Sequence, residues 1–247
     1  MHCGILALLF LFATLNADDY GTWSNWRYVY LITNSNGAEV TGSTVTNFPV
    51  LIRFNPSNFD GLGSTSNSGA DIRFAKTDGT HFPYAIERWT NYSTTNDTAE
   101  IWVLVDTIKP NDTTKIIMYW NRGGAVDSSS SEKVFSTSYG FQGVWHLGDS
   151  SGNVIDATNN SYDGTINGNQ YRTAGRVAHA ESYDGSGDYS EMANVLNMDY
   201  TSATTSFWVK RASIGSNQTI VAKSNGGNPN SIYGFVFSID NANCVHM

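Results

Sequence analysis

The stretch of sequence that decides the fold is residues 140–164, GFQGVWHLGDSSGNVIDATNNSYDG. A short apolar run at 144–147 leads into residues rich in Gly, Ser, Asn and Asp. The apolar run predicts a short strand, and the polar residues after it predict a long loop. One set of strand-favouring runs precedes this stretch, and a second set with a different rhythm follows it. The stretch therefore predicts the beginning of a second domain.

The composition of the chain favours many short strands joined by turns. The 247 residues are enough for two ordinary domains. Aromatic residues make up 13% of the chain, and Thr, Ser, Asn and Gly are abundant, which is typical of strands and turns. The formal net charge of −8 argues against nucleic acid as a partner, because a phosphate backbone is bound by clustered Lys and Arg. We expect an all-β protein with two β-sandwich domains in tandem.

The N-terminus has the pattern of a secretory signal. Residues 4–15, GILALLFLFATL, are too few to span a bilayer as a helix, which needs about 20 residues. Their length and position predict a signal peptide at 1–17, although no Lys or Arg precedes them. The alternatives are an uncleaved anchor and a misassigned start. We expect an extracellular or cell-surface protein without a transmembrane segment. Cleavage would remove Cys3 and leave Cys244 without a partner in the mature chain.

An exported chain offers sites for glycosylation. The Asn-x-Ser/Thr pattern occurs at Asn91, Asn96, Asn111, Asn159 and Asn217. In a chain this rich in Asn and Thr, several of these would arise by chance. They matter only in a host that glycosylates such sites.

The first half of the chain contains six runs with the composition of strands. They cover residues 27–33, 48–54, 71–74, 82–89, 100–105 and 115–120. The last two runs are apolar on both faces, which favours strands in the centre of a sandwich. Asp71, Arg73, Glu87 and Arg88 alternate along strands, a pattern more typical of cross-strand pairs or a solvated face than of an active site. Residues 126–139 have the composition of a linker.

Several phrases of this half occur in a specific order. They are 26–28 (WRY), 48–52 (FPVLI), 71–74 (DIRF), 84–89 (YAIERW), 99–103 (AEIWV) and 116–121 (IIMYWN). On these phrases residues 18–125 resemble DUF2341, a domain family of unknown function found in secreted and surface proteins of microbes. The resemblance implies a β-sandwich outside the cytoplasm and no particular activity.

The second half, residues 140–247, carries a different set of phrases. They are a Trp-x-Leu run at 145–147, then 149–152 (DSSG), 183–185 (YDG) and 207–210 (FWVK). These phrases are similar to those of LamG-like jelly rolls in the concanavalin A-like lectin/glucanase superfamily, although Tyr183 stands where Phe is usual. We expect strands at 144–147, 205–210, 219–223 and 233–239.

The second half has too few residues for a complete jelly roll of that family. We therefore expect a partial domain, completed by further residues of the same polypeptide or by a strand of a neighbouring copy. An incomplete sandwich would expose sheet edges and apolar faces, such as that of Phe235 and Phe237.

Calcium is the cofactor that the loops suggest, if the protein has one. Asp184 and Asp188 lie four residues apart on a Gly-rich turn, and carboxylate oxygens are ligands that calcium prefers. Asn228 and Asn230 lie in a loop similar to one that supplies calcium ligands in some relatives of the LamG-like domain. The alternative is that these residues only form turns.

The sequence favours binding over catalysis. It contains none of the common hydrolase, nucleotide-binding or zinc-protease signatures, and no run of paired carboxylates like that of glycosidases with this sandwich. We expect a non-catalytic, secreted or cell-surface binding or adhesion module that recognises glycans or surface proteins. One alternative is a structural subunit of a surface layer or filament, whose partners would be copies of itself. Another is an accessory part of a larger carbohydrate-active enzyme.

Overall fold

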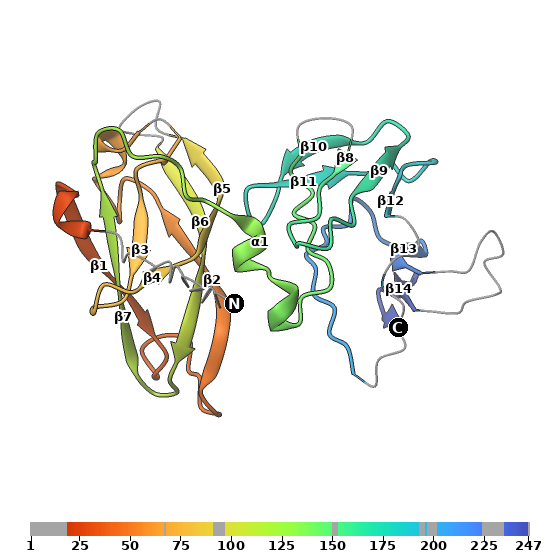
Figure 1. Ribbon diagram of the computed structural model, residues 1–247. Coiled ribbons are helices and arrows are strands. Elements are labelled where there is room, and N and C mark those ends of the chain that lie inside the picture. The colour runs from red at the N-terminus through yellow and green to blue at the C-terminus, as the bar shows by residue number, and fades with distance from the viewer. Residues whose placement is uncertain are drawn as a thin grey trace, which may run out of the picture. The chain divides into compact units, whose positions relative to one another are not determined.

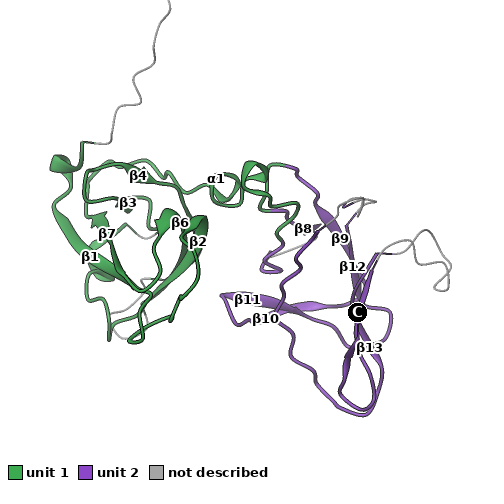
Figure 2. Ribbon diagram, turned by 90° about the horizontal axis from the view of Figure 1, so that it is seen from below, with its two compact units in different colours: residues 1–144, 157–159 green, residues 145–156, 160–247 purple. Residues whose placement is uncertain are grey.

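The protein is described by a computed structural model that covers residues 19–66, 68–90, 97–149, 153–192, 196, 202–223 and 235–246. The expected signal peptide, the sequons at Asn91 and Asn96, and the calcium candidates Asn228 and Asn230 lie outside these residues. The chain is all-β, as its composition predicts. It divides into two compact units (Figure 2). Unit 1 comprises residues 1–144 and 157–159, and unit 2 comprises residues 145–156 and 160–247. No helix in the described ranges is long and apolar enough to cross a membrane.

Unit 1 is a sandwich of two antiparallel sheets (Figure 1). One sheet has the strand order β1-β7-β3-β4 and the other has the order β2-β6-β5. The strands are β1 (Asn25–Ile32), β2 (Val45–Phe54), β3 (Arg73–Ala75), β4 (His81–Phe82), β5 (Tyr84–Thr90), β6 (Thr98–Ile108) and β7 (Thr113–Trp120). Two short 3-10 helices accompany them, η1 (Tyr20–Thr22) and η2 (Leu62–Ser64).

The run expected as one strand at 82–89 is divided between the two sheets. Pro83 separates β4, which pairs with β3, from β5, which pairs with β6. Proline has no backbone N–H to donate to a ladder, so a strand is readily interrupted there. The Pro83 carbonyl still accepts a hydrogen bond of 2.9 Å from the backbone N–H of Leu104.

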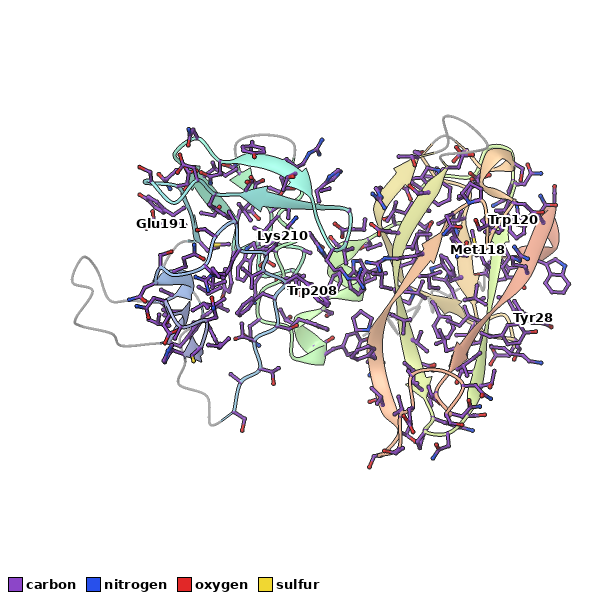
Figure 3. All side chains as sticks on the ribbon, turned by 180° about the vertical axis from the view of Figure 1, so that it is seen from behind. Tyr28, Met118, Trp120, Glu191, Trp208 and Lys210 are labelled. Carbon is purple, nitrogen blue, oxygen red and sulfur yellow. The ribbon has the colours of Figure 1, made fainter. Side chains whose placement is uncertain are left out.

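The core of unit 1 lies between the two sheets. Alternate residues of β6 and β7 point into it, among them Ile101 and Val103 from β6 and Met118 from β7, all with 0% exposure. Figure 3 shows Met118 and Trp120 inside the sandwich. Burying a side chain of this size contributes about 1.5–3 kcal/mol, so this interface is the main source of stability in unit 1.

The outer face of the β2-β6-β5 sheet is covered by residues that follow β7. Helix α1 (Ser131–Val134) and the 3-10 helix η3 (Thr137–Tyr139) lie in this segment. Val134 and Phe135 are buried in a second cluster with Ala85 and Leu104 of the sheet. The expected linker at 126–139 therefore contributes packed side chains to unit 1.

The described residues of unit 2 form three small antiparallel sheets. Their strand orders are β10-β11, β12-β9-β8 and β13-β14-β15. The strands are β8 (Asn153–Val154), β9 (Gly164–Asn167), β10 (Tyr171–Ala174), β11 (His179–Ser182), β12 (Tyr189–Met192), β13 (Gln218–Ala222), β14 (Val236–Ile239) and β15 (Val245–His246). Among the described residues of unit 2, the buried apolar side chains are Val154 and Ala178. Phe235 and Phe237 are half-buried and pack edge to face with centroids 5.4 Å apart.

Two strand predictions in the second half were wrong. Residues 205–210 form no strand, and Trp208 is 77% exposed. An alternating apolar run becomes a strand only where a neighbouring strand accepts its hydrogen bonds, and none of the described strands pairs with this one. At 144–147 the only pairing recorded is a single bridge between Trp145 and Asp156.

Candidate functional site

The feature of unit 1 that is best placed to bind a ligand is a line of aromatic side chains on β1. Trp26, Tyr28 and Tyr30 occupy alternate positions of this strand, so all three point to the outer face of the sheet. They are 55%, 39% and 50% exposed. We call these three residues the aromatic strip. Figure 3 shows Tyr28 pointing away from the sandwich.

The local sequence explains why the aromatic side chains face outward. The intervening residues of β1 include Val29 and Leu31, which pack against the core of the sandwich. The strand therefore places Val29 and Leu31 inside and its aromatic residues outside. Among the described strands, β1 lies at the end of its sheet and pairs with β7 alone, so the strip runs along an edge strand.

The three rings hold one another at fixed angles. The ring centroids of Trp26 and Tyr28 are 5.3 Å apart with an angle of 77° between the ring planes. Those of Tyr28 and Tyr30 are 6.0 Å apart with an angle of 52°. Edge-to-face and tilted pairs of this kind are favourable arrangements of aromatic rings. The strip is therefore partly ordered before any ligand arrives.

Lys115 of β7 adds a positive charge to the strip. It lies opposite Tyr30 in the ladder. Its ammonium nitrogen is 5.4 Å from the ring centroid of Tyr28 and 6.0 Å from that of Tyr30, within the range of a cation–π interaction. Lys115 is exposed. The arrangement combines aromatic faces with one cationic hydrogen-bond donor.

The other part of this sheet face is covered by the residues before β1. The ring of Tyr20 stacks on that of Tyr119, with centroids 4.2 Å apart and an angle of 8°. The Tyr20 hydroxyl also lies 3.0 Å from His81 Nδ1. Burial raises the pKa of the Tyr119 hydroxyl above its ordinary value. Trp23 covers the guanidinium of Arg73, at 5.4 Å from its ring.

The buried charges that alternate along the strands have structural roles. Arg73 donates hydrogen bonds to the carbonyl oxygens of Ala70, Ile72 and Val126. The carboxylate of Asp71 accepts hydrogen bonds from two backbone N–H groups. Arg88 forms an ion pair with the buried Glu100 at 3.4 Å. These contacts give Asp71, Arg73 and Arg88 roles in holding the sandwich together.

The calcium candidates Asp184 and Asp188 form a tight turn in unit 2. Asp188 Oδ2 accepts a hydrogen bond from the backbone N–H of Asp184 at 2.9 Å, and its Oδ1 accepts one from Asn169 at 2.8 Å. These bonds hold the pKa of the Asp188 carboxyl below its ordinary value. Asp184 Oδ1 accepts a hydrogen bond from the backbone N–H of Ser186. In the described ranges, no three His, Cys, Asp or Glu residues gather around one point.

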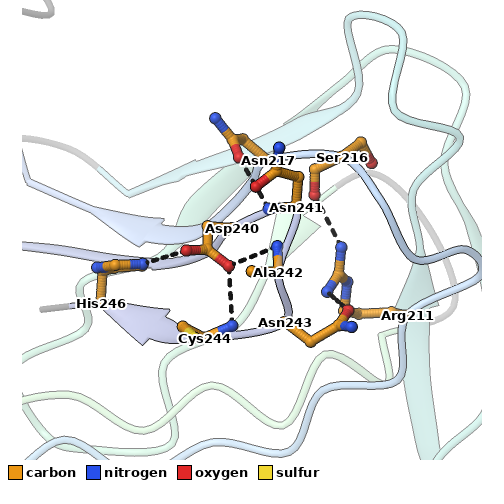
Figure 4. A network of polar contacts seen from close by, with 9 residues as sticks. All are labelled: Arg211, Ser216, Asn217, Asp240, Asn241, Ala242, Asn243, Cys244 and His246. Atoms are coloured by element: carbon orange, nitrogen blue, oxygen red, sulfur yellow. Dashed lines mark hydrogen bonds and ion pairs between the residues drawn. The ribbon is translucent and has the colours of Figure 1, made fainter.

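A second carboxylate network closes the turn between β14 and β15 (Figure 4). Asp240 Oδ1 accepts hydrogen bonds of 2.8 Å from the backbone N–H groups of Ala242 and Cys244. Asp240 Oδ2 lies 2.7 Å from His246 Nε2. The contact with His246, followed by the Cys244 N–H, holds the pKa of Asp240 below its ordinary value. The Cys244 thiol is free and exposed. The network stabilises a turn and uses both carboxylate oxygens of Asp240.

The three sequons within the described residues are all exposed. Asn111 lies in the turn between β6 and β7. The side-chain oxygen of Asn159 accepts a hydrogen bond from the backbone N–H of Thr137, and that of Asn217 accepts one from Asn241. Exposure leaves Asn111, Asn159 and Asn217 compatible with glycosylation, which stays a prediction.

The aromatic strip was not predicted from the sequence, although a signal was present. In residues 26–31, WRYVYL, the aromatic residues occupy every second position, Arg27 and Val29 stand between them, and Leu31 follows. A strand with aliphatic residues on one face and aromatic residues on the other has two apolar faces. Which of the two faces the core depends on the partner sheet.

The fold and the strip together define unit 1 as a β-sandwich with an open aromatic face. Among known families, the domain of unknown function DUF2341 matches residues 68–152. The match confirms the resemblance for the phrases at 71–74, 84–89, 99–103 and 116–121, and the phrases at 26–28 and 48–52 precede it. It extends past the expected boundary at 125 and includes the segment that covers the β2-β6-β5 sheet. Searches of curated proteins and of solved structures found no match.

Proposed function

We propose that this protein is a non-catalytic binding module that recognises glycans through the aromatic strip, outside the cell or at its surface. The observation that carries the proposal is the exposure of three aromatic side chains along one edge strand. Contiguous exposed apolar patches larger than about a few hundred Å² commonly mark interaction sites. The pattern of a signal peptide at 1–17 agrees with a role outside the cytoplasm.

The spacing of the strip suits a sugar polymer. Alternate residues of a strand are about 6.6 Å apart, so the three rings form a line along β1. The C–H face of a pyranose ring stacks on an aromatic ring, and successive sugars of a polymer would meet successive rings. A binding surface of this kind requires no catalytic group. It also fits an accessory domain within a larger carbohydrate-active enzyme.

Array binding of the whole chain tests this proposal. The full chain is applied to an array of polysaccharides, together with the variants Trp26→Ala, Tyr28→Ala and Tyr30→Ala. Each substitution should weaken binding to the recognised glycan by about tenfold, because an aromatic contact is worth about 1–1.5 kcal/mol. The matched control is Tyr139→Ala, which removes an exposed ring from another part of unit 1.

The strip variants show whether glycan binding depends on the aromatic strip. Binding that all three strip variants retain would refute the proposal. Binding to immobilised extracellular proteins but to no glycan, lost in the strip variants, would instead assign the strip to a protein partner.

A second candidate function is a structural subunit that assembles with copies of itself. The observation that favours it is the exposure of Phe207, Trp208 and Val209 in unit 2, at 39%, 77% and 46%. We propose that residues 140–247 form a partial LamG-like jelly roll, in which this run would pair with an added strand. Sedimentation of the full chain and of Trp208→Ser tests self-assembly. A monomer at all concentrations would count against it.

A further inference from the structure

Among the described strands, the outward-facing positions of the β1-β7-β3-β4 ladders carry no carboxylate. The register of the ladders places one set of side chains on this face. The set is Trp26, Tyr28, Tyr30, Ile32, Arg73, Ala75, His81, Thr113, Lys115, Ile117 and Tyr119. It contains no Asp or Glu, although the chain as a whole has a net charge of −8. At these ladder positions the charged side chains Arg73 and Lys115 therefore have no carboxylate among the strand residues that share their face.

Lys115 is the exposed charge of that face. Arg73 is 4% exposed, and its guanidinium is bound to backbone carbonyls beneath Trp23. Lys115 is exposed, and its ammonium nitrogen lies within 6.0 Å of the ring centroids of both Tyr28 and Tyr30. In the part of the chain that the structure describes, no ion pair within 4.0 Å is recorded for it. A ligand on the strip would therefore meet one cation that is available to an anionic group.

The angles between the rings favour a single twisted chain over a flat surface as the ligand. The planes of neighbouring rings differ by 77° and 52°. Rings at such angles do not lie together on the flat face of a crystalline polysaccharide. They suit a single chain whose successive sugars are rotated relative to one another, with each sugar presenting its face in a new direction.

We propose that the ligand of the aromatic strip is a single twisted chain of an acidic polysaccharide, whose carboxylate or sulfate group pairs with Lys115. This inference rests on the proposed function, because it uses the same strip, and adds the chemical class of the glycan. The net negative charge of the protein does not prevent such binding. Charges separated by more than about 8–10 Å are largely screened at physiological salt, whereas a contact with Lys115 is short-ranged.

Four polymers distinguish the classes of ligand. Binding of the full chain is measured against polygalacturonate, dextran sulfate, hydroxyethylcellulose and microcrystalline cellulose. We expect polygalacturonate or dextran sulfate to bind more tightly than either neutral polymer. The preference between the two acidic polymers tells carboxylate from sulfate. Raising the NaCl concentration should weaken this binding and leave any binding of hydroxyethylcellulose nearly unchanged.

Three lysine variants test the role of the charge. Lys115→Gln should lower the affinity for the acidic polymer by about three- to fivefold, the effect of losing one exposed ion pair. Lys115→Arg keeps the charge and should retain binding. The matched control is Lys133→Gln, an exposed lysine of α1 in the same unit, which should bind like the parent protein. Thermal unfolding of each variant shows whether the fold is unchanged.

Several results would overturn this inference. One is equal affinity for acidic and neutral polymers, with no effect of Lys115→Gln. Another is a preference for microcrystalline cellulose. In both cases, loss of binding in Trp26→Ala would leave the proposed function standing. A dimer in solution that Trp26→Ala dissociates would identify the strip as an interface between copies and would overturn both proposals.

Discussion

Replacing Phe135 by alanine tests whether the segment after β7 belongs to the first sandwich. Phe135 is 4% exposed and packs on the outer face of the β2-β6-β5 sheet. Its ring lies 5.6 Å from that of Trp102 and 5.5 Å from that of Phe141, both edge to face. The composition of this segment predicts a linker, whereas the structure gives it a buried aromatic side chain.

The expected loss of stability follows from the burial and the ring contacts. Truncating a buried Phe to Ala costs about 3–5 kcal/mol, and the lower end applies where the surroundings can collapse. The covering segment has its own short helices and loops, so we expect about 3 kcal/mol. With a urea dependence of about 2 kcal/mol per molar, the unfolding midpoint of unit 1 should fall by about 1.5 M.

The assay should report on unit 1 alone, because two units that unfold separately break a two-state description. Amide hydrogen exchange of β5 and β6 under increasing urea meets this need. The control is Tyr139→Ala in the same segment, where the ring is 43% exposed and the change should stay within about 0.5 kcal/mol. If Phe135→Ala changed stability as little as this control, residues 126–139 would be a linker in solution and the packing argument would be refuted.

Three further predictions follow from the buried and turn-forming polar groups. Glu100 is 5% exposed and pairs with Arg53 and Arg88. Glu100→Ala should therefore destabilise unit 1 by about 1–3 kcal/mol in urea unfolding. The loss is limited because both arginines remain partly in water. Burial raises the pKa of Tyr84 from 10.0 to about 12. The folded state therefore keeps the phenol proton to a higher pH than the unfolded state does. The contribution of this group to stability is full below pH 10 and is lost as the pH rises towards 12. The free energy of unfolding, obtained from urea titrations, should fall by about 1 kcal/mol between pH 8 and pH 11 for this reason. The variant Tyr84→Phe should lack this part of the pH dependence. If the turn at Asp188 holds calcium, millimolar CaCl₂ should raise the thermal midpoint of the full chain, and Asp188→Asn should abolish the rise; a rise that persists in this variant would place the calcium elsewhere.

Much of the first sandwich could be predicted from the sequence. The runs at 48–54, 100–105 and 115–120 all lie within observed strands, because alternation and continuous apolar runs are local signals of a strand. The all-β class followed from composition, because aromatic residues, Thr, Ser, Asn and Gly are typical of strands and turns. The resemblance to DUF2341 rested on phrases within these strands, and residues 68–152 match that family.

The expected strand at 205–210 shows where local signals fail. Phe207 and Val209 alternate with polar or aromatic residues as in a strand, yet the segment is unpaired and exposed. A strand is stable only when its backbone groups find partners, and partners come from distant parts of a chain. The calcium candidates at Asp184 and Asp188 show a similar limit, because Asp and Gly at such spacing form turns with or without an ion.

The sequence by itself determined that aromatic and aliphatic residues alternate along β1. Only the tertiary structure decided that Trp26, Tyr28 and Tyr30 face outward while Trp120 of the paired strand faces the core. The physical reason is that a period of two fixes which residues share a face of a strand and leaves open which face meets the other sheet. That choice depends on the summed burial of all the strands, and it is this choice that creates the aromatic strip.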